Sequence, residues 1–166
     1  MELFSTGIDE STGAKRLTVR GPWNAEYVEF FASQGFTCLW LIQSLGFNGR
    51  RLDFLAGIPN LHHLLVLGGA FDDDSGIEAC GELRTLELTS NARNELRLSR
   101  LSNLQYVFIS RAPGRDDVLD SASIRQLYIY GYKEADLSSL KQMAALADLA
   151  VGPAAIKAKV EELEAT

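Results

Sequence analysis

Leu61-His62-His63-Leu64-Leu65-Val66 is the clearest copy of a short phrase in which apolar residues hold the first, fourth and sixth positions. The phrase recurs every 20 to 25 residues along the chain. Four further good copies begin at Leu83, Leu104, Ile124 and Leu146, and two looser ones begin at Ala14 and Phe36. A period in this range indicates a solenoid, in which each unit buries its apolar edge by stacking on its neighbours.

Each unit holds two hydrophobic periodicities. In the second half of the phrase, every second residue is apolar, as at Leu64 and Val66. This alternation is typical of a short strand with one buried face. A spacing of three precedes the next strand in residues 52–61, 98–104 and 137–146. This second spacing predicts a helical or 3₁₀ turn on the opposite side of the coil.

These patterns resemble the leucine-rich repeat (LRR) family, and the resemblance covers about residues 14–151. It implies an α/β fold, an LRR solenoid with a parallel β-sheet on the concave side and helical or 3₁₀ returns on the convex side. The family usually carries an Asn at the ninth position of the phrase, and only Asn91 matches it here. The buried Asn ladder that joins successive loops is therefore largely missing.

We expect a single LRR domain over residues 1–166, with about seven repeats in 14–151. Residues 1–13 are predicted to form an N-terminal cap, as part of a hairpin whose second arm is the first repeat strand. Residues 152–166 are either a C-terminal capping helix or the start of a truncated repeat, since they favour a helix with one apolar face. The longest unit is the second, and we expect it to bulge near 46–49.

Composition narrows the class of protein. A chain of 166 residues that is 46% hydrophobic can bury a core. The net charge of −6 argues against nucleic acid, which needs a basic stripe, and mildly favours a basic partner. The chain start lacks a secretory pattern, and no stretch approaches the roughly 20 apolar residues of a membrane span.

Cysteine usage bears on the compartment. Cys38 and Cys80 fall in different repeat phases, so a disulfide framework is not expected and a reducing cytoplasm fits best. The excess of Arg over Lys, with abundant Ala and Gly, is typical of a GC-rich bacterial genome. We therefore expect a cytoplasmic protein of bacterial type.

The residues that alternate with the leucines in each strand are predicted to face outward from the concave sheet. Aromatic side chains bury roughly 150–250 Å² each, so many of them in water are costly and usually mark a binding surface. We predict that another protein binds there, on Trp40, Ile42, His63, Leu65, Leu67, Glu87, Tyr106, Phe108, Tyr128 and Tyr130. Glu87 would require a cationic or hydrogen-bonding group on that partner.

Two other interpretations of this surface remain open. Strands favour aromatic and branched residues whether or not a partner covers these side chains. Four of the rings could therefore pack against one another without a partner. These rings belong to Tyr106, Phe108, Tyr128 and Tyr130. The second interpretation is a homodimer, in which another copy of the chain covers the patch.

Acidic residues follow several strands and predict a negative edge beside the apolar floor. They are Asp72, Asp73 and Asp74, then Asp116, Asp117 and Asp120, then Glu134 and Asp136. Such an edge would steer a basic protein toward the face. Asp74 followed by Ser75 also predicts a plain helix start. A calcium loop is not expected there, because the glycine comes one position early and Leu83 holds the place of the required Glu.

Catalytic, metal and cofactor chemistry is not predicted. His62 and His63 are adjacent on a strand and so point to opposite faces, which prevents both from binding one metal ion. Cys38 and His63 share a strand phase, but no acid near them would orient the histidine. Nucleotide-binding and hydrolase motifs do not occur in the sequence.

The expected function is therefore a non-enzymatic, cytoplasmic protein–protein interaction module. The family resemblance implies interaction and nothing more specific. By analogy, small acidic repeat proteins of bacteria resemble immunity proteins, which occlude a toxin. The alternative is a structural or regulatory adaptor, or a homodimerising repeat protein.

Overall fold

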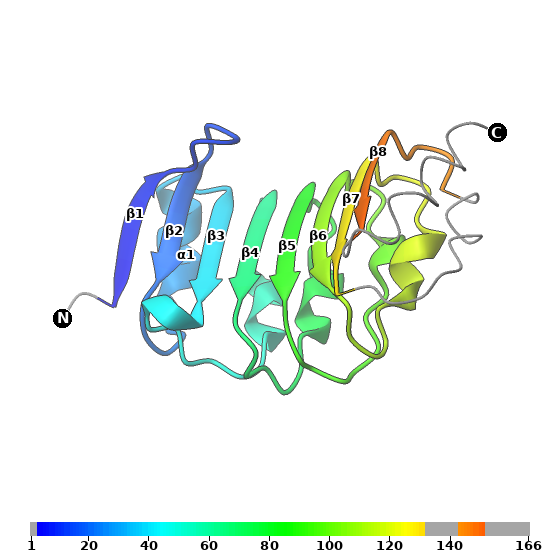
Figure 1. Cartoon of the computed structure of the whole chain (residues 1–166). Helices are drawn as coiled ribbons and strands as arrows, with labels where there is room; N and C mark the ends of the chain where they lie inside the picture. Colours follow the sequence, from blue (N-terminus) through cyan, green and yellow to red (C-terminus); the bar gives the residue numbers. More distant parts are fainter. Residues whose placement is uncertain (1–2, 132–142, 152–166) are drawn as a thin grey trace.

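The computed structural model describes residues 3–131 and 143–151, which form one sheet with strand order β1 to β8 (Figure 1). The strands are β1 Phe4–Ile8, β2 Lys15–Val19, β3 Cys38–Ile42, β4 His63–Leu67, β5 Thr85–Thr89, β6 Tyr106–Ser110, β7 Gln126–Tyr130 and β8 Asp148–Val151. From β2 onward every pair is parallel. The predicted α/β solenoid, which resembles a leucine-rich repeat, is confirmed.

Short helical returns lie behind the sheet (Figure 1). They are the helix α1 Glu26–Ser33 and the 3₁₀ turns η1 Gln43–Leu45, η2 Asp53–Gly57, η3 Ser75–Ala79, η4 Leu98–Arg100 and η5 Asp116–Asp120. All of them except η1 bury at least one apolar residue in the core, such as Leu55 in η2 and Ile77 in η3. The spacing of three therefore predicted η2 and η4 correctly, whereas most of the third such segment, 137–142, lies outside the described residues.

The strand register stacks equivalent residues into rows. Leu39, Leu64 and Leu86 are direct partners on β3, β4 and β5, and Leu41, Val66 and Leu88 form the next row. All six are buried in the core. A side chain that points inward from one strand thus meets its equivalent from the next repeat, which explains why the phrase recurs so regularly.

The N-terminal end of the core is closed by the predicted hairpin. β1 pairs antiparallel with β2, with Phe4 opposite Val19. The Phe4 ring packs against Tyr27 and Phe30 of α1, at centroid distances of 5.7 and 5.2 Å. The cap predicted for residues 152–166 lies outside the described residues.

The loops that follow the strands are joined by an arginine instead of an Asn ladder. The Arg115 guanidinium donates to the Ala92 and Asn94 carbonyls at 3.2 and 3.0 Å, and to Asp74 Oδ2 at 2.6 Å. Asn91, the one residue that matches the family position, is exposed. Arg115 therefore connects its own loop to the loops of two preceding repeats.

The longest unit places its extra residues after η1, in an irregular loop through residues 46–50. This is the position that the turn-forming residues predicted for a bulge. The next 3₁₀ turn, η2, restores the common pattern, and β4 then aligns with β3 in the usual register.

Candidate protein-binding face

One side of the sheet is free of the helical returns, and we call it the open face (Figure 1). Strand alternation fixes which side chains it carries. The register pairs them across the sheet in a central row of Thr18, Trp40, Leu65, Glu87, Phe108 and Tyr128. A second row near the strand starts contains Cys38, His63, Thr85, Tyr106, Gln126 and Asp148. A third row near the strand ends includes Ile42, Leu67 and Thr89, with Ser110 and Tyr130 paired farther along.

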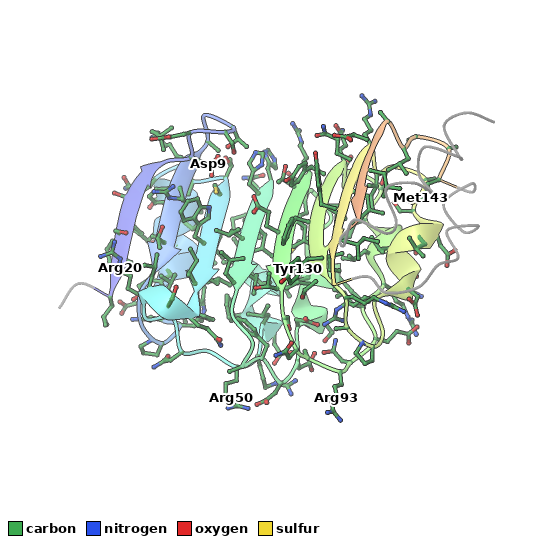
Figure 2. All side chains as sticks on the ribbon, viewed as in Figure 1. Asp9, Arg20, Arg50, Arg93, Tyr130 and Met143 are labelled. Atoms are coloured by element: carbon green, nitrogen blue, oxygen red, sulfur yellow. The ribbon has the colours of Figure 1, made fainter. Side chains whose placement is uncertain are left out.

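Most of the predicted binding residues lie on this face and remain accessible to solvent. Tyr130 is 69% exposed and projects from the front of the sheet (Figure 2). The half-buried members of the set are Trp40, His63, Leu67, Glu87, Tyr106, Phe108 and Tyr128. The alternation is cleanest in β5, β6 and β7, where every second residue is buried.

Two predicted surface residues are buried instead. Leu65 is only 8% exposed, and it lines a small cavity of about 20 Å³ together with Asp9 and Ser11 of the loop between β1 and β2. Ile42 is 7% exposed; it is the last residue of β3, next to Leu67 and just before η1. The prediction that both side chains are exposed on this face is wrong.

The rings of the face contact one another and polar groups of the same chain. Tyr106 and Tyr128 lie 5.5 Å apart between ring centroids, and the Tyr128 hydroxyl donates to Asp148 Oδ2 at 2.9 Å. At the other end, the Arg16 guanidinium carbon lies 3.8 Å from the centroid of the Trp40 ring. The Tyr106–Tyr128 contact is one that the sheet-packing interpretation expected, and both side chains remain half-buried.

Glu87 is the acidic residue in the middle of this apolar row. Its carboxylate forms no hydrogen bond or ion pair with any residue that the structure describes. Burial, with a smaller contribution from the negative charge of Asp9, raises the pKa of Glu87 above its ordinary value. The site can therefore accept a hydrogen bond or a positive group from outside the chain.

Cys38 and His63 are register partners, but their environment suppresses nucleophilic chemistry. Cys38 is buried, and burial first, then the charge of Asp9, raises its thiol pKa to about 12. Burial lowers the pKa of His63, and His62 adds to this effect. Asp9 does not serve as an acid that orients His63, because Asp9 Oδ1 already accepts hydrogen bonds from Ser11 and Thr12.

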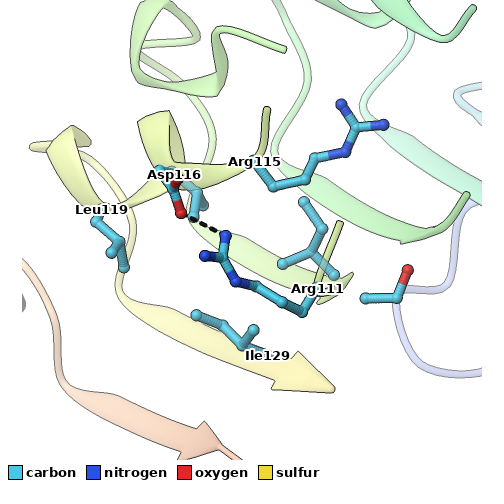
Figure 3. Close-up of a pocket in the computed structure, with 8 residues that line it drawn as sticks. Arg111, Arg115, Asp116, Leu119 and Ile129 are labelled. Carbon is cyan, nitrogen blue, oxygen red and sulfur yellow. Dashed lines mark hydrogen bonds and ion pairs between the residues drawn. The ribbon is translucent and has the colours of Figure 1, made fainter. Parts of the chain in front are cut away.

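Most of the aspartates predicted to form a negative edge are engaged within the chain, which weakens that edge, whereas Asp120 is exposed and has no side-chain partner among the described residues. Arg50 binds Asp72 at 2.6 Å, and Arg51 binds Asp73 at 3.0 Å. Asp74 is fully buried in its ion pair with Arg115. Figure 3 shows Arg111 directed toward Asp116 at the start of η5, where the two form a further ion pair. Asp117 accepts from the Ser99 amide at 2.7 Å, and Glu134 and Asp136 lie outside the described residues.

Asp74 and Ser75 do mark the start of η3, as predicted. The side chain that caps the turn is that of the preceding residue, since Asp73 Oδ1 accepts from the Ser75 amide at 2.9 Å. Hydrogen bonding from the Ser75 side chain, followed by this bond from its amide, lowers the pKa of Asp73. Within the described part of the chain, no group of three or more His, Cys, Asp or Glu side chains is placed to hold a metal ion.

Sequence reasoning missed a set of polar residues just ahead of the strands. Arg84, Gln105 and Arg125 directly precede β5, β6 and β7, and all three are exposed. They line a groove of about 420 Å³ at the strand-start end of the open face. The signal was available, because each follows the first apolar residue of its phrase.

Comparison with known proteins adds no relative. No family model matches the chain, and no curated protein matches it. No helix among residues 3–131 and 143–151 is both long and apolar enough to cross a bilayer.

Proposed function

We propose that this chain is a non-enzymatic protein-binding module of the leucine-rich repeat type, which receives its partner on the open face. The observation that supports this most is the presence of half-buried rings in the central row, including Trp40 and Tyr128, on the side of the sheet without helical returns. Tyr and Trp are the residue types that most often dominate interface energy. The sheet holds them in a hydrogen-bonded frame, so docking orders few additional groups.

Both thiols are buried, so neither is accessible as a nucleophile in the folded chain. Specificity would come from Glu87, whose unpaired carboxylate lies between Leu65 and Phe108. A partner that covers Glu87 has to supply a donor, because an unpaired charge in an interface is costly.

The test is capture of proteins from native lysate on the immobilised chain, compared with the variant Trp40→Ala/Tyr128→Ala. The control variant Ile8→Ala/Leu45→Ala also removes two exposed or partly exposed apolar side chains, but away from the open face. We expect a protein that wild type and control retain and that the first variant loses, with thermal unfolding of all three nearly unchanged. Equal retention by all three, or a large loss of stability in the first variant, would overturn the proposal.

An immunity protein and an adaptor would both use such a surface, and they differ in what binding does. An immunity protein abolishes the activity of the captured toxin, whereas an adaptor leaves its partner active. A homodimer would instead place a second copy on the face. Light scattering separates this alternative, since Trp40→Ala/Tyr128→Ala should then convert a dimer into a monomer.

A further inference from the structure

The groove at the strand-start end of the open face is built by consecutive strands. The Gln105 amide donates to the Arg84 carbonyl at 2.9 Å, and the Arg125 amide donates to the Gln105 carbonyl at 2.8 Å. These bonds fix Arg84, Gln105 and Arg125 as neighbours in one row. Two strand spacings, roughly 10 Å, therefore separate the backbones of the two arginines.

The two arginines of the groove are free, unlike the arginines that neutralise the opposite end of the sheet. Arg50, Arg51 and Arg115 each bind an aspartate. Arg84 and Arg125 form no side-chain hydrogen bond or ion pair with the residues that the structure describes. Both line the groove and both are exposed.

Acidic groups near the groove are already engaged or lie farther along the face. Glu82 accepts from His62 at 3.3 Å, and Asp148 accepts from the Tyr128 hydroxyl. Glu87 is two residues beyond Thr85 along β5, in the central row. Among the residues that line the groove itself, the two arginines are the charged ones and none is acidic, on a chain whose net charge is −6.

The other groove residues add neutral hydrogen-bonding groups. Gln105 and Gln126 carry amide donors, and Tyr106 and Thr85 carry hydroxyls, all beside the two guanidinium groups. A guanidinium donates two parallel hydrogen bonds to a carboxylate, which makes it a selective binding group for planar acids. In an extended segment, alternate residues lie roughly 7 Å apart on one side, a spacing that two flexible arginine side chains can span.

We infer that this groove binds a short acidic segment of the partner protein, with its carboxylates held by Arg84 and Arg125. The inference rests on the proposed function, because the groove is continuous with the open face through Tyr106 and Thr85. A long polyanion such as a nucleic acid fits less well. It would extend beyond the two arginines along the surface of this chain, whose net negative charge would repel it. The partner thus combines an acidic segment for the groove with a donor group for Glu87.

Fluorescence anisotropy with a short labelled peptide of alternating Glu and Ser tests this at low salt. We expect the wild-type chain to bind this peptide. It should not bind the same peptide with Gln in place of Glu. Arg84→Gln/Arg125→Gln should weaken binding roughly tenfold or more, since it removes charge-assisted hydrogen bonds. Arg93→Gln/Arg100→Gln makes the same change in net charge at two exposed arginines outside the groove, and it should leave binding within about twofold.

Several results would overturn the inference. One is an equal loss of peptide affinity in the two arginine variants, and another is no binding of the Glu peptide by wild type. A third is tighter binding of a labelled single-stranded oligonucleotide than of the peptide, with the same dependence on Arg84 and Arg125. Thermal unfolding of both variants should match wild type, because all four side chains are exposed. If capture from lysate needs Trp40 and Tyr128 but tolerates Arg84→Gln/Arg125→Gln, the groove inference fails while the proposed function stands.

Discussion

Arg115 and Asp74 form a buried ion pair at 2.6 Å although 41 positions separate them in the chain. They are 2% and 0% exposed. The same guanidinium reaches carbonyls of the intervening repeat, so one side chain unites three consecutive loops. A solenoid without an Asn ladder thereby gains a contact that extends beyond nearest neighbours.

Removal of one partner from this pair should be strongly destabilising. Arg115→Met leaves the Asp74 carboxylate buried without its cation, at a cost of about 3–5 kcal/mol in the free energy of unfolding, measured by urea denaturation. Asp74→Leu combined with Arg115→Met should recover part of that loss, because no lone charge remains buried. Arg50→Met breaks the exposed pair with Asp72 and should change stability little. A small effect of Arg115→Met would show that the pair carries little of the stability.

The loop that presents Arg115 depends on the glycine before it. Gly114 has a φ of +77°, and a Cβ there would lie 2.7 Å from the Asn94 carbonyl oxygen. Gly114→Ala should therefore lower the free energy of unfolding by more than the roughly 1–2 kcal/mol of a left-handed alanine. Gly13→Ala is the matched control, because Gly13 has a φ of +70° but no atom within 4 Å of its Cβ position. Equal losses in the two variants would mean that the contact with Asn94 relaxes without cost.

The raised pKa of Glu87 predicts the sign of a pH effect. An acid whose pKa is higher in the folded state stabilises the fold below its ordinary pKa of 4.5, and this contribution is lost as the pH rises through the folded value. Glu87→Gln resembles the protonated acid, so it should raise the midpoint of thermal unfolding at about pH 7 and change it little at about pH 3.5. A lower midpoint at neutral pH would instead show that the carboxylate has a stabilising partner.

Both thiols should be inert in the folded chain. Burial raises the pKa of Cys80 to about 12, and that of Cys38 reaches about 12 as well. Because the thiolate is the reactive form, a disulfide reagent at about pH 8 should modify neither residue at an appreciable rate until denaturant is added. Rapid modification of Cys38 in native buffer would show that the β1–β2 loop opens and exposes the second row of the face.

Strand positions followed from the sequence because the core rows repeat with one period. Leu64 and Leu86 carry the same signal one turn of the solenoid apart, and the register places them side by side. The burial of Leu65 could not be predicted in this way, since it depends on how the β1–β2 loop lies against β4. The pairing of Arg115 with Asp74 likewise required the positions of three loops.

Part of the charge pairing in the strand-end loops is encoded in the spacing of arginines and aspartates. Arg50 and Arg51 precede Asp72 and Asp73 by 22 positions, which is one repeat. In a solenoid, residues one period apart are neighbours, so opposite charges at that offset indicate ion pairs. Counting acids alone therefore overestimated the negative charge of this edge, because Asp72 and Asp73 are paired with arginines.

The reversed direction of β1 has an evolutionary consequence. Tandem duplication lengthens a solenoid by adding a strand that runs the same way as its neighbour. A strand added beside β1 would have an antiparallel neighbour. It would also lack the buried leucine row that successive units share. Copies of the unit can be gained or deleted on the far side of β2 without disturbing that arrangement, so related chains of different length should keep this hairpin and vary in the number of turns behind it.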